Sequence, residues 1–374
     1  MKILHIYKAA LPESMGGIEQ VINTLAVGVL KQGVIADVLS LSAKKSYSTD
    51  YRGYKIYYCN QDFLLASTGF SLQAIYTFWK LSKRADIIHF HFPWPYMDLM
   101  FFLLRLKNPS IVTYHSDIVK QKILLNFYKP LKNWFLSNVD LIISTSPNYL
   151  VTSDVLKRYV RKVEVIPIGL EKNSYPSINI ERLKYWKNLV GERFFLFIGV
   201  LRYYKGLKIL LDALALRDLP FVIIGSGPIE AELKIQAVSL GLKNVVFLGF
   251  VADEDKVALI HLSYAMVFPS HMRSEAFGVS LLEGAMFGKP MISSEIGTGT
   301  CFVNVNQVTG IVVAPASSND LHKAMVYLWD NPEIATQMGL KAAERFEQLF
   351  TADKMCQAYV EIYRRLINKN IRNL

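Results

Sequence analysis

Two glutamates in one short segment are the residues of this chain best placed to do chemistry. Glu275 and Glu283 lie in RSEAFGVSLLEGAMFGKP (273–290), with seven mostly apolar or small residues between them. The pattern predicts an apolar helix that begins near Gly278 and ends at a Gly-Lys-Pro stop. Glu275 would stand just ahead of the helix N-terminus, where free N–H groups favour an anion, and Glu283 two turns inside. A ligand with phosphates at the helix start and hydroxyls on either side could use both carboxylates as hydroxyl acceptors.

Two cations could neutralise such phosphates. Arg202 and Lys205 lie in GVLRYYKG (199–206), directly after an apolar run that reads as a strand. Three residues apart at the end of a strand, they could converge on a diphosphate, the arginine as a fork and the lysine as a point charge. A solvated basic turn is the alternative reading of these two residues.

Glycine-rich loops follow several of the predicted strands. Gly16 and Gly17 in MGGIE (15–19) open a predicted helix, as a phosphate-binding loop would, although a tight turn also requires glycine. GSGP (225–228) also follows a strand, but Glu230 stands where the dinucleotide fingerprint needs its third glycine. A nicotinamide enzyme is therefore not favoured.

The remaining polar groups give weaker signals. The acidic run in VADEDK (251–256) could bind a metal, but it stands where a helix should begin, and acidic residues there complement the helix dipole. His115 ends a strand and is a ligand candidate. His89 and His91 alternate along one strand and share a face, with no third ligand at zinc spacing, so we interpret them as core or cleft-lining residues.

The elements that must position these residues are strands alternating with helices. This alternation predicts doubly wound α/β sheets, and VIPIGLEKNSYPS (165–177), rich in Pro, Gly and Ser, predicts a linker between two of them. Two facing Rossmann-like domains would form a cleft at the carboxyl ends of their strands. The predicted strands are 2–7, 35–41, 85–91, 110–115 and 140–146, then 193–199, 220–225, 244–250, 264–270, 289–295 and 310–315.

Composition bounds the class of protein. The chain has 374 residues, of which 52% are apolar and 20% charged, as expected for a folded protein with two domains. Three scattered cysteines indicate reduced thiols in the cytoplasm, and the first residues do not resemble a signal peptide. The longest apolar stretch (97–107) is too short for a membrane span, so we expect a soluble protein or one lying on a membrane surface.

The net charge of +11 is uneven. Residues 1–170 carry 20 Lys and Arg against 11 Asp and Glu, which suggests an anionic partner. Within them, 119–138 interleaves Lys120, Lys122, Lys129 and Lys132 with apolar and aromatic residues, and it could lie on an anionic membrane. A partly buried helix with solvated lysines is the alternative. A nucleic-acid binder is not favoured, because the chain has no arginine-rich stripe and no RNA-module motif.

A sugar nucleotide has the layout that the two glutamates require: ribose hydroxyls, a diphosphate and sugar hydroxyls. Along its whole length, the sequence resembles the GT-B-fold retaining glycosyltransferases of family 4. The resemblance is carried by Gly16 and Gly17, His115, IPIG (166–169), GVLRYYKG, GSGP, FLGF (247–250) and the E-x7-E of Glu275 and Glu283. Ile168 departs from the family pattern, where many members carry an asparagine after the proline.

The resemblance implies a role for each matching residue. Arg202 and Lys205 would bind the donor diphosphate, Glu275 the sugar hydroxyls and Glu283 the ribose, and His115 would reach the sugar. Further donor contacts would come from Gly16, Gly17, Gly225, Gly249, Phe250, Phe277, Gly278 and Val279. The implied domains are an acceptor-side domain (1–169), a nucleotide-sugar-binding domain (170–350) and a C-terminal helix (351–374) that crosses back to the first.

The segment EIGTGTCFVNVNQVTG (295–310) looks most like members that build bacterial surface polysaccharides, often mannosyl- or rhamnosyltransferases using GDP-sugars. The resemblance implies transfer of a hexose, with GDP-mannose expected as donor, to a lipid-linked or growing O-antigen glycan at the inner face of the membrane. We expect front-face attack with retention and no metal or other cofactor, because Arg202, Lys205 and a helix N-terminus would supply the positive charge. Alternatives are a UDP-sugar donor with a small-molecule or lipid acceptor, a phosphorylase or sucrose-type synthase, and a non-catalytic sugar-nucleotide sensor.

Overall fold

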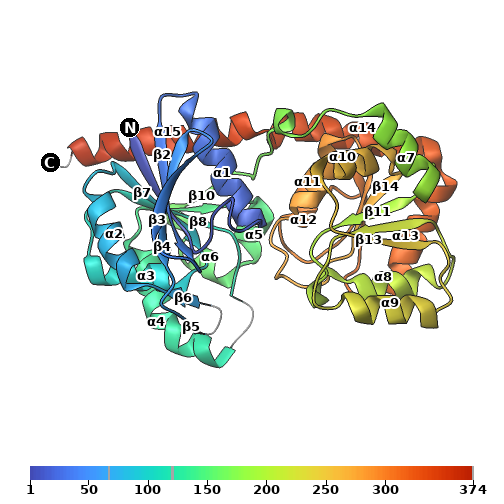
Figure 1. Cartoon of the computed structure of the whole chain (residues 1–374), viewed down its shortest axis with the longest axis horizontal. Helices are drawn as coiled ribbons and strands as arrows, with labels where there is room; N and C mark the ends of the chain where they lie inside the picture. Colours follow the sequence, from blue (N-terminus) through green and yellow to red (C-terminus); the bar gives the residue numbers. More distant parts are fainter. Residues whose placement is uncertain (66–67, 119–121, 373–374) are drawn as a thin grey trace. The chain divides into compact units, whose positions relative to one another are not determined.

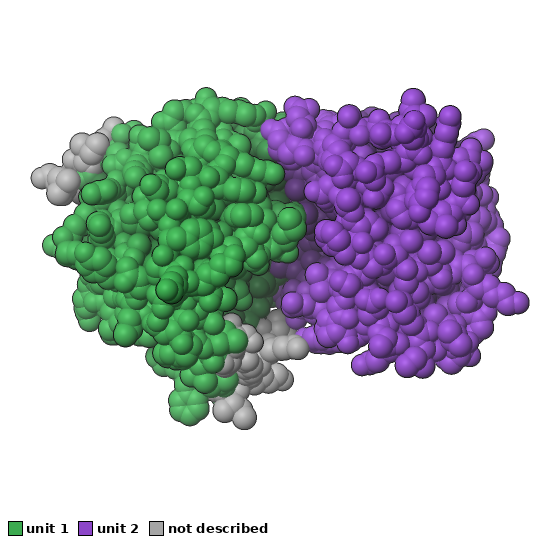
Figure 2. Space-filling view, viewed as in Figure 1, with its two compact units in different colours: residues 1–169, 352–374 green, residues 170–351 purple. Residues whose placement is uncertain are grey.

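The computed structural model describes residues 1–65, 68–118 and 122–372. The chain divides into two compact units, coloured separately in Figure 2. Unit 1 contains residues 1–169 and 352–374, and unit 2 contains residues 170–351. The division after residue 169 falls within the stretch that the sequence predicts as a linker.

Unit 1 is built on an eight-stranded sheet in the order β10-β9-β8-β7-β1-β2-β4-β3. All neighbours are parallel except β3 and β4, which form an antiparallel hairpin. The strand order reverses between β1 and β7, so this is an open doubly wound sheet. Its strands are β1 (Lys2–Ile6), β2 (Ile35–Ser42), β3 (Tyr47–Tyr51), β4 (Tyr54–Asn60), β7 (Ile87–Phe92), β8 (Ser110–Tyr114), β9 (Leu141–Ser144) and β10 (Val163–Val165). A separate two-stranded hairpin pairs β5 (Phe63–Leu65) with β6 (Thr68–Phe70).

The helices of unit 1 cover this sheet, and the C-terminal helix is one of them. Figure 1 shows α15 (red) beside α1, and the two helices are in contact. The side chains of Ser71 and Ser146 cap α2 and α5 by accepting a hydrogen bond from the first turn. The helices are α1 (Gly17–Leu30), α2 (Leu72–Ser82), α3 (Pro95–Leu104), α4 (Lys122–Asn138), α5 (Pro147–Thr152), α6 (Asp154–Arg158) and α15 (Ala352–Arg372).

Unit 2 has a six-stranded parallel sheet in the order β13-β12-β11-β14-β15-β16. Numbered within the unit this is 3-2-1-4-5-6, the doubly wound order of dinucleotide-binding folds, and it reverses between β11 and β14. The strands are β11 (Phe195–Ile198), β12 (Phe221–Ile224), β13 (Val245–Gly249), β14 (Ala265–Phe268), β15 (Met291–Ser294) and β16 (Gly310–Val313). Most of their residues are buried on both faces, which explains why they read as continuous apolar runs.

Helices lie on both faces of this second sheet, as the strand–helix alternation requires. They are α7 (Ile180–Val190), α8 (Leu207–Leu214), α9 (Glu230–Ser239), α10 (Asp253–Leu262), α11 (Val279–Met286), α12 (Thr300–Val303), α13 (Ser318–Asp330) and α14 (Pro332–Leu349). The prediction of two parallel-sheet α/β units is confirmed, and each of the eleven predicted strands is present with bounds that differ by a few residues at most.

Candidate active site

The loops after β11 and β14 meet at the point where the strand order of unit 2 reverses. In doubly wound sheets, ligands bind outside the carboxyl ends of the strands at this point. Gly206, which follows the 3-10 helix η3 (Tyr203–Lys205), shows how closely these loops pack. Its φ is +74°, and a Cβ there would lie 1.9 Å from the carbonyl oxygen of Pro269. Only glycine fits this position, so the first loop is held against the second.

Lys205 and Glu275 come together across these two loops. The ammonium group of Lys205 forms an ion pair with the carboxylate of Glu275, and each side chain is only 12% exposed. The lysine Nζ also lies 4.6 Å from the centre of the Phe268 ring, at the end of β14. Arg202 lies in the same loop as Lys205 and is exposed to solvent. The cation and the carboxylate that the sequence predicts as site residues are therefore neighbours in the structure.

The helix after Glu275 begins where the sequence predicts. Gly278 is the N-cap of α11, with φ +89° and ψ 71°, and Val279 is the first helical residue. A Cβ at Gly278 would lie 3.1 Å from a methyl carbon of Leu281, and the left-handed backbone adds strain for any other residue. Phe277 is buried, with 4% of its surface exposed. No side chain caps the first turn of α11, and a helix N-terminus without such a cap is a favourable place for an oxyanion.

Glu283 lies inside α11 and is buried, with 5% exposed. Its Oε1 accepts a hydrogen bond of 3.0 Å from the hydroxyl of Tyr175 and lies 3.1 Å from Nζ of Lys256 in α10. Burial alone would lower the pKa of Lys256, but its ion pairs with Glu283 and Asp253 outweigh that effect and raise the pKa. The Glu283 carboxylate is thus held in place by one hydroxyl and one cation.

The glycine loops of unit 2 are required by backbone packing. A Cβ at Gly225, whose φ is +125°, would lie 2.1 Å from the carbonyl oxygen of Gly199, and one at Gly227 would lie 2.4 Å from that of Leu201. Gly249 also has a positive φ of +65°. Next to it, Phe250 is 80% exposed, an aromatic surface at the carboxyl end of β13.

The acidic run at the start of α10 binds side chains of this chain. Asp255 accepts hydrogen bonds from Nη1 of Arg182 at 2.5 Å and from Nε1 of Trp186 at 2.9 Å. Asp253 pairs with Lys256 at 3.0 Å. These carboxylates thus pair with side chains of this chain at the first turn of a helix, where acidic residues complement the helix dipole.

The remaining predicted site residues lie in unit 1. Gly16 is the N-cap of α1 and Gly17 opens it, but the first turn already holds a carboxylate: a Cβ at Gly16 would lie 2.4 Å from Oε2 of Glu19. His115 directly follows β8 and is 5% exposed. Its Nε2 lies 3.0 Å from Nδ1 of His91, so it belongs to a larger group of buried histidines.

The predicted membrane-facing segment needs a correction. Lys132 is buried, with 8% exposed, so its prediction as a surface cation is wrong. Lys132 comes after Tyr128 in α4, and the Tyr128 hydroxyl donates a hydrogen bond to the fully buried Asp98 of α3. Burial lowers the pKa of Lys132. Lys120 lies outside the described residues, whereas Lys129 is exposed. No helix in the described part of the chain is both long enough and apolar enough to cross a bilayer.

Sequence reasoning missed three residues that complete these groups. Lys256 and Tyr175 hold Glu283, and His5 adds the third imidazole to His89 and His91. In the sequence, Lys256 is only the last residue of the acidic run VADEDK (251–256), and nothing there links it to Glu283. His5 lies 84 residues before His89, and only the pairing of β1 with β7 brings the two together.

Two family models match this chain. Residues 15–173 match the family model "Glycosyltransferase Family 4", and residues 180–345 match "Glycosyl transferases group 1". The chain is 54% identical to D-rhamnosyltransferase WbpZ of Pseudomonas aeruginosa, over 94% of this chain and 93% of the relative. It is 48% identical to O-antigen chain mannosyltransferase C of Escherichia coli, over 98% and 99%.

Solved structures share the fold at low sequence identity. Sucrose-phosphate synthase from Thermosynechococcus elongatus superimposes with a TM-score of 0.80 at 20% identity, covering 98% of this chain and 99% of that one. HepE of Anabaena in complex with UDP gives 0.78 at 18%, covering 98% and 100%. Together with the family matches along both units, these likenesses show that the chain belongs to the family 4 glycosyltransferases of the GT-B fold.

Proposed function

We propose that the protein is a retaining glycosyltransferase that moves a hexose from a nucleotide-sugar donor, with GDP-mannose the expected donor, to a lipid-linked or growing bacterial O-antigen glycan. The observation that carries the proposal is the Lys205–Glu275 pair at the strand-order reversal of unit 2, ahead of the glycine-capped α11. A cation, a carboxylate and a helix N-terminus gathered at one sheet edge suit a diphosphate joined to a hydroxyl-rich sugar.

The two lysine–glutamate pairs suggest which part of the donor each residue binds. Lys205, joined by the exposed Arg202, would neutralise the diphosphate as it leaves, while Glu275 accepts hydrogen bonds from the sugar hydroxyls. Glu283 would bind the ribose. An ionised carboxylate has about four lone-pair sites, so the contacts with Tyr175 and Lys256 leave sites for a ribose diol.

In this proposal, the configuration at the anomeric carbon is retained because the acceptor attacks from the front face. Glu275 is committed to hydroxyls and to Lys205, so we assign no nucleophile beneath the anomeric carbon. The acceptor hydroxyl would attack from the face that the diphosphate leaves, and the departing phosphate oxygen would take its proton. The protein would contribute orientation and charge neutralisation, with no metal required.

The relatives' names support the sugar class. One is a D-rhamnosyltransferase and the other an O-antigen chain mannosyltransferase, and the chain covers nearly the whole of both. D-rhamnose is 6-deoxymannose and lacks only the C6 hydroxyl of mannose, so the choice between GDP-mannose and GDP-rhamnose depends on the residues that contact C6. The neighbour that binds UDP keeps a UDP-sugar donor as the alternative.

A membrane-bound acceptor would suit the basic unit 1. On α4, Phe127 is 82% exposed and Leu124 is 50% exposed, and Lys129 is exposed as well. We propose that α4 contacts anionic lipid through these exposed side chains, with the aromatic ring entering the interface and the cation near the headgroups.

The decisive experiment is a donor panel. Purified protein is heated with GDP-mannose, GDP-rhamnose, UDP-glucose or UDP-galactose, because a ligand of the folded state raises the apparent melting temperature. Release of the nucleotide is then measured with and without a polyprenyl-diphosphate-linked oligosaccharide. We expect a GDP-sugar to stabilise most, and nucleotide release to need the acceptor. Binding without any transfer would instead indicate a sugar-nucleotide sensor.

A further inference from the structure

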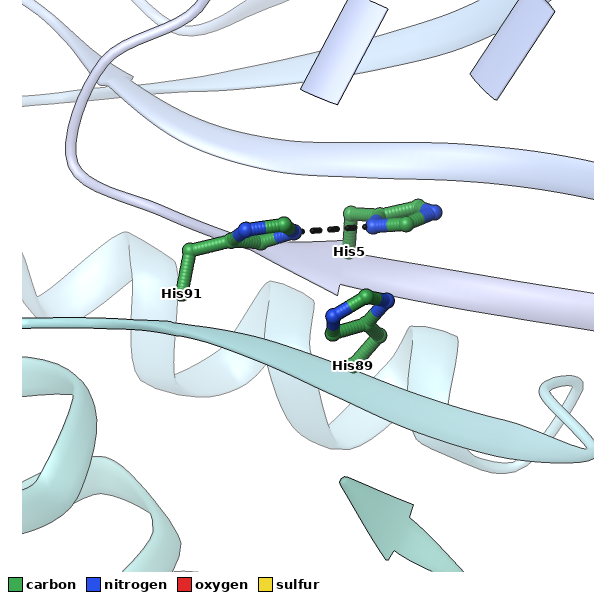
Figure 3. Close-up of side chains that lie close together, drawn as sticks. All are labelled: His5, His89 and His91. Atoms are coloured by element: carbon green, nitrogen blue, oxygen red, sulfur yellow. Dashed lines mark hydrogen bonds between the residues drawn. The ribbon is translucent and has the colours of Figure 1, made fainter. Parts of the chain in front are cut away.

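Four histidines gather on one face of the sheet in unit 1. His5 in β1 pairs with His89 in β7, His91 lies two residues further along β7, and His115 follows β8. Side chains two residues apart on a strand share a face, so the parallel register stacks these rings. The ring centres of His89 and His91 are 4.4 Å apart, and those of His5 and His89 are 4.7 Å apart. Figure 3 shows three of these rings, from His5, His89 and His91.

Three of the four form a continuous hydrogen-bonded row, which we call the histidine row (His5, His91 and His115). Nδ1 of His5 lies 3.0 Å from Nε2 of His91, drawn as the dashed line in Figure 3. Nδ1 of His91 lies 3.0 Å from Nε2 of His115. At the inner end, Nε2 of His5 is buried and has no hydrogen-bond partner among the described residues. At the outer end, His115 is 5% exposed, whereas His5 and His91 have no exposed surface.

His89 is equally buried but has different partners. Its Nδ1 lies 2.7 Å from the hydroxyl of Tyr363, and its Nε2 lies 2.7 Å from that of Thr113, which in turn bonds Tyr359. Its two ring nitrogens are therefore already engaged by hydroxyls. A metal bound by His5, His89 and His91 would have to displace one of these contacts, as well as one of the two hydrogen bonds that His91 makes with His5 and His115. The hydrogen-bonded row accounts for the geometry without that displacement.

The row restricts which nitrogens carry protons. Burial lowers the pKa of His5 and of His115 to about 3, and that of His91 well below its usual value, so all three rings are neutral at pH 7. A neutral ring has one N–H and one lone pair. Both hydrogen bonds can then form in only two ways: every ring protonated on Nδ1, or every ring protonated on Nε2.

The buried end decides between these two states. With protons on Nε2, His5 would present an N–H to a site that offers no acceptor among the described residues. With protons on Nδ1, the inner end is a bare lone pair, and the N–H at the outer end belongs to His115. Buried N–H groups without an acceptor are the rarer defect in folded proteins, so the Nδ1 state is favoured.

We propose that His5 and His91 are positioning residues that hold His115 as its Nδ1–H tautomer, so that it presents a fixed N–H donor to the transferred sugar. The contact with the sugar rests on the proposed function, whereas the tautomer does not. Free histidine prefers the Nε2–H form, so the row would hold His115 in the less common state. A donor with a fixed orientation suits a sugar oxygen, and no reorientation is needed when the sugar arrives.

Nitrogen NMR tests the tautomer directly. With [15N]histidine in the full chain, each of the seven imidazoles shows whether Nδ1 or Nε2 carries the proton, and substitution of single histidines assigns the signals. We expect Nδ1–H for His115 in the wild type at pH 7. In His91→Leu, His115 should revert to Nε2–H, whereas in His91→Asn it should keep Nδ1–H, because the amide nitrogen can donate from the place of the lost Nδ1. A wild-type His115 protonated on Nε2, or one equivalent of zinc bound to the cluster and removed by chelation, overturns the proposal.

Kinetics with the same variants tests the purpose of the row. In transfer from GDP-mannose to the polyprenyl-linked oligosaccharide, His91→Leu should lower kcat by about tenfold or more, with the donor KM changed less than about twofold. His91→Asn should recover most of kcat, and His89→Asn, with equal burial but outside the row, should stay near the wild type. Equal losses in both His91 variants would overturn the positioning role. A wild type that transfers no sugar would count against the proposed function, while the NMR signals would still decide the tautomer.

Discussion

Lys256 of α10 and Glu283 of α11 form an ion pair of 3.1 Å, and the hydroxyl of Tyr175 donates to the same carboxylate oxygen from 3.0 Å. The lysine side chain is 17% exposed and the glutamate 7%, so the pair is shielded from solvent. A shielded pair between helices fixes the orientation of the carboxylate before a ligand arrives. The second glutamate of the E-x7-E segment is thus held by residues from outside that segment.

Loss of this pair should weaken donor binding. Glu283→Ala removes the proposed ribose contact, which is similar in ground and transition states, so the donor KM should rise more than kcat falls. Lys256→Met should act in the same direction by leaving the carboxylate buried without its cation. Steady-state kinetics with varied GDP-mannose measures both effects.

A matched control separates this effect from general loss of ion pairs. Lys208→Met breaks a pair of 2.6 Å with Glu232 on the surface of the same unit, where both side chains are more than half exposed. Exposed pairs contribute about 0–1 kcal/mol, so the control should keep wild-type kinetics. An unchanged donor KM in Glu283→Ala would remove this residue from the binding site.

Glu275→Gln should mainly lower kcat. The amide keeps the shape and one acceptor, but it removes the charge that strengthens hydrogen bonds from the sugar hydroxyls and that holds Lys205. If Glu275 only terminated the loop before α11, the change would cost about 1 kcal/mol of stability or less and leave kinetics alone. Kinetics and melting temperature, measured on the same preparation, distinguish the two. Wild-type kcat in this variant would exclude Glu275 from the reaction.

Lys205→Ala should lower turnover by roughly 10²-fold, as expected when a group that stabilises developing charge is removed. Because Lys205 and Glu275 are in contact, their effects should not add. Glu275→Gln combined with Lys205→Ala should be less impaired than the product of the single losses predicts. Activity that resists EDTA would agree with charge neutralisation by side chains. Strict metal dependence would instead indicate a metal site at Asp253 and Asp255.

Lipid binding should depend on the exposed side chains of α4. Phe127→Ser and Lys129→Gln should each weaken sedimentation with vesicles of phosphatidylglycerol and phosphatidylcholine, the lysine by ~1 kcal/mol and more at low salt. Lys132→Met is the internal comparison: it removes the same charge from a buried position, so it should leave lipid binding unchanged. If lipid binding does not change with salt or with any of the three substitutions, α4 is an ordinary solvated helix.

Local patterns in the sequence predict much of this fold. The apolar runs of β11 and β14 and the glycine before α11 each act within a few residues of chain, so composition and spacing reveal them. The hairpin of β3 and β4 was missed, although Arg52 and Gly53 at its turn, both with positive φ, separate two tyrosine-rich alternating runs. That pattern is a recognisable hairpin signal.

Partners from distant parts of the chain could not be predicted. Lys132 reads as one of four basic residues on an amphipathic segment, and only the packing of α4 on α3 buries it near Asp98. Lys205 and Glu275 are 70 residues apart, and the strand order of unit 2 brings their loops together. Spacing along the sequence identifies which residues can do chemistry, while sheet topology decides which of them meet.

The buried histidines should make stability depend on pH. Burial lowers the pKa of His5, His89, His91 and His115 below the ordinary value of 6.5, so below about pH 6.5 the unfolded chain binds protons that the folded chain does not. Stability therefore rises with pH up to that value and is lost as pH falls below it, by up to roughly 1.4 kcal/mol per pH unit for each histidine.

The neighbours packed on these rings do not offset this loss. Tyr7, Tyr359 and Tyr363 face them, and burial raises the pKa of all three phenols, so they stay uncharged.

Asp98 acts in the opposite sense: burial raises its pKa, so the folded chain binds a proton above pH 3.8 and gains stability as pH falls. Urea unfolding of the wild type from pH 7.5 to 5.5 should show a net loss, since four histidines oppose one carboxyl. His91→Asn should flatten the slope by about one proton, and Asp98→Asn should steepen it. A flat wild-type profile would mean that the four rings are accessible to protons in the folded state.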